Sequence, residues 1–157
     1  MGKIKNIEIV TNVMLNRYGS YHVKSGARLG IVSAIDSLKG CGGYDGYLVE
    51  TETDKFYILI SNGQNCCEDW GYLDTNDNSK KFIGSELLNV SIVDQEYNKK
   101  FLMEADFSVE EENQICFVTF ETDKGDFQLA VYNSHNGYYG HDIIIVKNTD
   151  IIHQDTL

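Results

Sequence analysis

The sequence predicts a β-dominated α+β domain, with a mostly antiparallel sheet of about six or seven strands and one or two short helices. Strands are indicated because apolar, β-branched runs occur in pairs that are separated by short polar turns. Few helices are expected, since only one long segment has apolar residues at helical spacing. The 157 residues contain no proline and no repeat or linker, so residues 1–157 should form a single domain.

Residues 25–40 are the segment with helical spacing. Ile31, Ile35 and Leu38 are spaced i, i+4 and i+7, with a serine at the start and a glycine at the end. The same run is rich in β-branched residues and would also serve as a strand. Both interpretations stay open.

Two predicted hairpins supply four strands of the predicted sheet. Residues 46–52 and 56–61 are β-rich runs joined by a short polar turn. Residues 115–121 and 126–132 repeat this arrangement around a turn that contains glycine, a length typical of hairpins.

Three further segments complete the predicted fold. Residues 78–84 have a polar start and a glycine end, which indicates a short helix. Residues 86–96 alternate between apolar and polar types, and residues 141–147 contain an apolar run. Both are expected to be strands.

The acidic composition limits the classes of partner. Thirteen Lys and Arg residues against 24 Asp and Glu residues give a formal charge of −11, which would repel the phosphates of nucleic acid. The same charge suits docking on a basic protein surface. Glu110, Glu111 and Glu112 belong to an acidic run that is either a solvated loop or the contact with such a partner.

The cellular location is also constrained. The apolar runs are far shorter than a membrane span requires, and the N-terminal segment does not resemble a secretory signal. A cytosolic protein is therefore expected. In a reducing cytosol its four cysteines should be thiols or metal ligands rather than a disulfide framework.

The adjacent Cys66 and Cys67 are the main chemical signal. Thiolate and imidazole are zinc ligands, and His135 and His141 flank a glycine-bearing turn later in the chain. The sequence therefore predicts a metal site made of Cys66, Cys67, His135 and His141. Carboxylates that could add oxygen ligands are Glu68, Asp69 and Asp142.

Other interpretations of the cysteines are a strained, reducible vicinal disulfide and simple packing. Cys116 lies in an apolar run and is expected in the core. The acids of the first hairpin, which include Asp45 and Asp54, are expected on a solvated strand face. Because no acid–base set can be recognised, no catalytic residues are predicted.

The order of these motifs resembles a family of small phage and prophage proteins of unassigned function. The resemblance runs from about Leu29 to Val146, so residues 29–147 are the expected core and residues 1–28 an N-terminal extension. Gly140 departs from it, because the family tends to have serine there. The matching positions are Cys66, Cys67 and Glu68, then Ile83, Gly84 and Ser85, and last Asn136, Gly137, Tyr138 and Tyr139.

The resemblance implies a phage-encoded anti-CRISPR protein that binds Cas9 and blocks its DNA targeting in the cytoplasm of the infected bacterium. On this interpretation a zinc ion is structural, the acidic surface contacts Cas9, and the protein is not an enzyme. One alternative is a small metal-dependent hydrolase that acts on a host or defence nucleotide through an open coordination position. Another is a metal-free acidic module that binds proteins.

Overall fold

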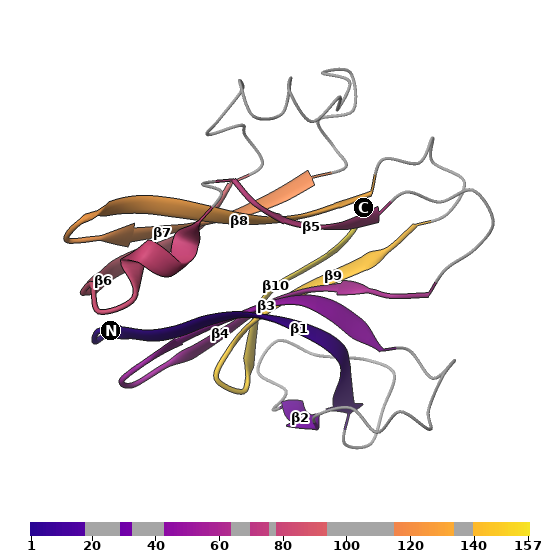
Figure 1. Ribbon diagram of the computed structural model, residues 1–157. Helices are drawn as coiled ribbons and strands as arrows, with labels where there is room; N and C mark the ends of the chain where they lie inside the picture. Colours follow the sequence, from indigo (N-terminus) through magenta and orange to yellow (C-terminus); the bar gives the residue numbers. More distant parts are fainter. Residues whose placement is uncertain (18–28, 33–42, 64–69, 76–77, 94–114, 134–139) are drawn as a thin grey trace.

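A computed structural model covers residues 1–157 and describes all of them except 18–28, 33–42, 64–69, 76–77, 94–114 and 134–139. The described residues form ten strands and one short 3₁₀ helix. Figure 1 shows the strands as two stacked sheets, with the N-terminus and the C-terminus toward opposite ends of the stack.

Both sheets are antiparallel, with the core between them. The six-stranded sheet has the order β10-β9-β4-β3-β1-β2 and the four-stranded sheet the order β5-β8-β7-β6. The strands of the first sheet are β1 (Ile4–Arg17), β2 (Leu29–Val32), β3 (Tyr44–Thr51), β4 (Lys55–Ser61), β9 (Asp142–Lys147) and β10 (Asp150–Thr156). Those of the second are β5 (Trp70–Asp74), β6 (Leu87–Val93), β7 (Ile115–Thr122) and β8 (Gly125–Asn133).

The predicted α+β class is wrong, because the described part of the chain contains no α-helix. The expected helix at residues 78–84 is only η1 (Ser79–Phe82), a 3₁₀ helix. Within residues 25–40, the described residues 29–32 form strand β2, which pairs with the end of β1. The β-branched side chains of this run, and the neighbouring strand that it can pair with, favour the extended conformation.

The two predicted hairpins are confirmed. β3 pairs with β4 and β7 pairs with β8, each antiparallel and without a break in register. Three strands were not predicted, namely β1, β5 and β10. In β1 polar residues interrupt the alternation of apolar and polar side chains, and the register against β3 shifts at two places. The sequence pattern of a strand is therefore hard to recognise there.

Aromatic and branched aliphatic side chains from both sheets fill the space between them. Phe56 of β4 contacts Phe120 edge to face, and Phe120 stacks on Phe127 with ring centroids 4.8 Å apart. Cys116 is 2% exposed in this main cluster, which confirms its predicted place in the core. Ile4 and Ile7 belong to the same cluster, so β1 packs as part of the sandwich.

The start of β1 also joins the two sheets. The Ile4 N–H donates to the Ser85 carbonyl at 2.9 Å, and the Gly84 N–H donates to the Ile4 carbonyl at 2.8 Å. Gly84 has a φ of 87°, in the left-handed region that favours glycine. The Ile83–Ser85 motif therefore has a structural role, since it forms the turn that holds β1 against the second sheet.

Candidate functional site

Most of the predicted site residues lie outside the described part of the chain. These are Cys66, Cys67 and His135 among the predicted metal ligands, and Glu110, Glu111 and Glu112 of the predicted partner contact. His141 is the only one of these site residues that the structure describes. It lies just before β9, where the two sheets end side by side.

His141 is held in one orientation. Its ring is 2% exposed and stacks on Trp70 of β5, with the ring centroids 5.1 Å apart. Nδ1 lies 2.7 Å from the carbonyl oxygen of Ser61 at the end of β4. A carbonyl can only accept, so Nδ1 carries the proton and donates it, which in a neutral ring leaves the lone pair on the buried Nε2.

The neighbours of His141 tie several strand ends together. Trp70 and Asn133 are register partners of β5 and β8, and the Asn133 side chain donates to the Leu157 carbonyl at 3.1 Å. His141 and Leu157 exchange two backbone hydrogen bonds of 2.9 Å. Residues 64–69 follow the end of β4 and precede β5, and residues 134–139 follow β8 and precede β9. The described residues that flank these two segments therefore meet around His141.

A structural zinc site usually has four ligands, and His141 could supply one of them. In the described part of the chain, no three His, Cys, Asp or Glu side chains lie close enough together to hold an ion. One buried imidazole with its Nδ1 proton on a backbone carbonyl fits the usual arrangement of a metal-bound histidine, in which the second nitrogen binds the ion. The four-ligand site stays a prediction.

A second group of polar residues lies where β3 of the first sheet contacts β5 of the second. It comprises Asp45 and Tyr47 of β3 and Tyr72 and Asp74 of β5, which we call the tyrosine–aspartate cluster. Successive residues of a strand alternate between faces, so each strand contributes two side chains to one face. That face is the inner one, because the register partner of each residue belongs to the main core cluster. These partners are, in the same order, Ile60, Ile58, Val131 and Leu129.

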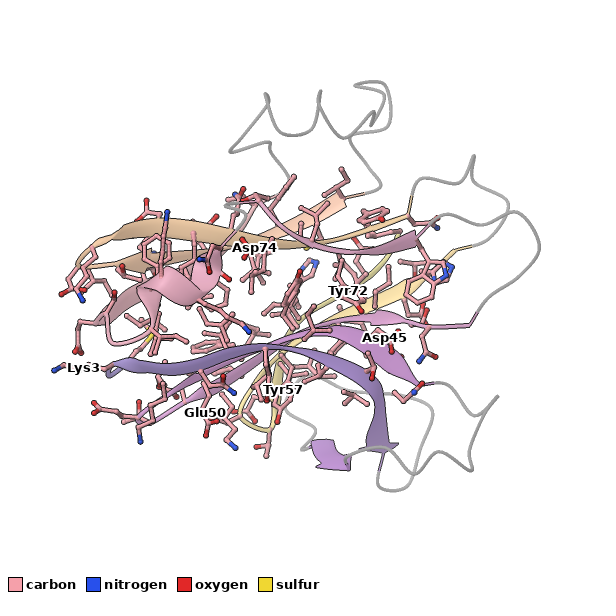
Figure 2. All side chains as sticks on the ribbon, viewed as in Figure 1. Lys3, Asp45, Glu50, Tyr57, Tyr72 and Asp74 are labelled. Carbon is pink, nitrogen blue, oxygen red and sulfur yellow. The ribbon has the colours of Figure 1, made fainter. Side chains whose placement is uncertain are left out.

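The two tyrosines meet across the gap between the sheets. Their ring centroids are 5.4 Å apart and the rings are nearly perpendicular, at 88°. Burial, followed by the charge of Asp74, raises the pKa of Tyr47, and burial, followed by the charge of Asp45, raises the pKa of Tyr72. Both phenols are therefore neutral at physiological pH. Figure 2 shows Tyr72, Asp74 and Asp45 on the side of the sandwich that faces the viewer, between the two sheets.

The carboxylates of the cluster are already positioned. Asp45 Oδ1 accepts hydrogen bonds from the backbone N–H of Asn12 at 2.8 Å and from the Asn62 side chain at 3.0 Å. Asp74 Oδ2 accepts the backbone N–H of Ser79 at 2.7 Å. These bonds hold two negative charges beside two phenol groups, an arrangement that attracts cations.

Sequence reasoning missed this cluster. Asp45 was expected on a solvated strand face, yet its side chain lies on the inner face and is only partly exposed. A signal exists in the sequence, since "YDGY" and "WGYLD" each place an aspartate and a tyrosine on one face of a strand. That these two faces oppose one another follows only from the stacking of the sheets.

Comparison with known proteins adds a family but no activity. A family model described as "Domain of unknown function (DUF7448)" matches residues 4–145. No curated protein and no solved structure matches the chain. Within the described ranges, no helix has the length and apolarity that crossing a membrane would take.

Proposed function

This chain belongs to the DUF7448 family, and we propose that it is a non-catalytic binding protein that docks its acidic surface on a basic surface of another protein. The observation that carries this proposal is the formal charge of −11 on 157 residues. Such a surplus accelerates association with a basic partner and disfavours acidic ones.

The described surface supports the proposal through the spread of its acids. Exposed carboxylates occur on β1, on the turns of both hairpins, at the start of β9 and on the edge strand β10. They are Glu8, Glu52, Asp123, Asp142, Asp150 and Asp155. The partner implied by the resemblance to phage proteins is Cas9, whose basic channels hold the guide and target backbones. Occupation of such a channel would block DNA targeting without any chemical step.

A structural zinc ion is part of this proposal. The support is the fixed tautomer of His141 and the meeting of Ser61, Trp70 and Asn133 around it. Cys66, Cys67 and His135 would supply the remaining ligands, and the ion would then stabilise this end of the sandwich.

The binding proposal is tested with purified Cas9–guide complex and the full chain at increasing salt concentration. We expect binding at low salt, and an affinity that falls steeply as salt screens the opposite charges. Target-DNA cleavage should fall in parallel with the fraction of Cas9 that is bound. Absence of binding at low salt would rule out Cas9 as the partner.

Charge reversal then locates the contact. Changing Glu110, Glu111 and Glu112 to lysine should weaken binding if this run meets the partner. The matched control changes Glu8, Asp150 and Asp155 to lysine, which alters the net charge equally at exposed positions elsewhere. Equal losses in both triple variants would show a diffuse effect of net charge and no contact at residues 110–112.

A further inference from the structure

The outer face of the second sheet is buried, although the first sheet packs on its other face. Val118 and Leu129 belong to the main core cluster between the sheets, so their neighbours Phe117 and Ala130 point to the outside. Yet Phe117 is only 2% exposed and Ala130 0%. Antiparallel sheets that are covered on one face commonly have a solvated, polar face on the other. A further part of the molecule therefore covers this outer face.

Two rows of side chains on this outer face are covered. The first row is apolar and crosses all four strands, since its members are successive register partners: Leu73, Ala130, Phe117 and Val93. In the second row Gln128 is 0% exposed and Thr119 6%, and the Gln128 side-chain amide donates to the Thr119 hydroxyl at 3.0 Å. The cover therefore extends over the middle of the sheet, where β7 and β8 pair.

The described elements do not account for this cover, because all described members of the outer cluster belong to strands of the second sheet. Residues 94–114 adjoin the cluster at both ends, since Val93 ends β6, Ile115 begins β7, and both pack in the cluster. This segment has 21 residues. The other segments outside the described part that adjoin this sheet have six residues or fewer: 64–69, 76–77 and 134–139. Residues 94–114 are therefore the segment with the length and the attachment points to cover the face.

Within this segment, residues 101–110 have the side-chain pattern that such a cover requires. Every odd position from 101 to 109 is apolar, namely Phe101, Met103, Ala105, Phe107 and Val109. The even positions from 104 to 110 are polar, namely Glu104, Asp106, Ser108 and Glu110. Alternate side chains of an extended chain point to opposite sides, so one side of this run is apolar and the other acidic. Ten extended residues span about 33 Å, whereas four strands measure only about 14 Å across.

We infer that residues 101–110 lie across the outer face of the second sheet, with their apolar side chains on the row from Leu73 to Val93. Their acidic side chains then point to solvent and form one strip with Glu111 and Glu112. This inference deepens the proposed function and rests on it for the role of the strip, which is the surface that a basic protein partner contacts. The position of the segment itself rests on the burial of the outer face alone.

The position of the segment is tested by nuclear Overhauser effects in the full chain with labelled methyl and aromatic groups. We expect contacts between the methyl group of Ala130 and apolar side chains at odd positions from 101 to 109. Contacts of the Ala130 methyl group only with residues outside 94–114 would overturn the inference. Contacts with Leu102 in place of the odd positions would overturn the proposed orientation of the run.

Two serine variants test which side of the run packs on the sheet. Phe107→Ser should lower the melting temperature by about 6 °C or more, because it removes a large apolar side chain from the cover. Leu102→Ser is the matched control, since an even position points to the opposite side, and it should change the melting temperature far less. Equal losses in the two variants would contradict the inference. If Phe107→Ser does not fold, the contacts of the Ala130 methyl group in the parent decide the question.

Binding to the Cas9–guide complex separates this inference from the proposed function. The double variant Glu104→Lys, Asp106→Lys should bind more weakly than the control Glu8→Lys, Asp150→Lys, which changes the net charge equally at exposed positions elsewhere. Equal binding by the two double variants would contradict the role of the strip and leave the proposed function intact. The expected contacts at Ala130, together with no binding of the parent to Cas9, would contradict the proposed function and leave the position of the segment intact.

Discussion

At the scale of single residues, Gly46 is the described glycine with the least space for a side chain. It lies in β3 with a φ of 154°, between Val10 of β1 and Leu59 of β4 in the register. A Cβ at this position would come within 1.9 Å of the carbonyl oxygen of Ile58. Strand β4 could move away only by breaking its backbone hydrogen bonds to the neighbouring strands, so only glycine fits here.

We therefore expect Gly46→Ala to lower the free energy of unfolding by at least about 2 kcal/mol. Gly63→Ala is the control, because nothing lies within 4 Å of a Cβ built there and its φ is not positive. The free energy of unfolding of Gly63→Ala should stay within about 0.5 kcal/mol of that of the parent. Urea unfolding measures both, and similar values for the two variants would contradict this account of Gly46.

Asp54 shows how one carboxylate joins two turns. It accepts hydrogen bonds from Thr53 at 2.7 Å and from the Asn148 side chain at 3.0 Å, and it lies 3.5 Å from the Lys147 ammonium group. The Thr53 bond comes first among the causes that hold the pKa of Asp54 below its ordinary value of 3.8, followed by Asn148 and Lys147, against the effect of burial. The lowered pKa means that the ionised form stabilises the fold.

The sign of the pH dependence follows from that direction. Stabilisation by Asp54 is present above pH 3.8 and is lost as the pH falls through the lower pKa of the folded state. Asp54→Asn should therefore cost up to about 1 kcal/mol at pH 7, since the pair is near the surface. The difference from the parent should narrow below pH 3.8, as measured by thermal melts across pH. Glu8→Gln, an exposed charge change, should show no such narrowing.

At the scale of elements, both hairpin turns use a threonine in the same way. Thr51 Oγ1 accepts the backbone N–H of Asp54 at 2.9 Å, and Thr122 Oγ1 donates to the Gly125 carbonyl at 2.6 Å and accepts the Lys124 N–H at 3.2 Å. Both threonines are nearly buried, at 4% and 6% exposure. The hydroxyl thus satisfies backbone groups that the tight turn would leave unpaired.

Thr122→Val removes these bonds while keeping the shape of the side chain. We expect it to lower the free energy of unfolding by about 1–2 kcal/mol, because it leaves a backbone N–H and a carbonyl in the turn without their partner. Thr11→Val on β1 is the control, since Thr11 is exposed and valine favours strands. A loss in Thr11→Val equal to that in Thr122→Val would show that the hydroxyl of Thr122 is not the cause.

At the scale of the whole molecule, the two sheets are joined at opposite ends by different means. Backbone hydrogen bonds between β1 and the Gly84–Ser85 turn hold one end. At the other end His141, Trp70 and Asn133 bring together strands from both sheets. The proposed zinc ion would strengthen this second end.

If a zinc ion is bound at this end, protein purified without added metal or chelator should contain about one zinc ion per chain by elemental analysis. Cys66→Ser and His141→Gln should lose the zinc, and removal of the ion should lower the melting temperature of the parent. The controls are Cys116→Ser, a change in the core, and His153→Gln, a partly exposed histidine of β10. No zinc in the parent would contradict the metal proposal, and loss of zinc in the controls as well would point to general unfolding.

The sequence by itself determined what depends on neighbouring residues. The β3–β4 and β7–β8 hairpins were predictable, because a strand, a tight turn and a second strand form contacts between residues close in the chain. The place of Cys116 in the core follows from its apolar run, and the charge of −11 from composition. The acidic character that supports the proposed function therefore needed no structure.

Only the tertiary structure decided the remaining features. The segments at β1 and β5 become strands because neighbouring strands of the sheets offer them hydrogen bonds, which local propensity does not encode. The burial of His141 on Trp70 likewise depends on which strand ends meet. Tyr47 and Tyr72 contact each other because the sheets stack with β3 under β5, and the positions of two sheets relative to each other are set by packing of the whole core.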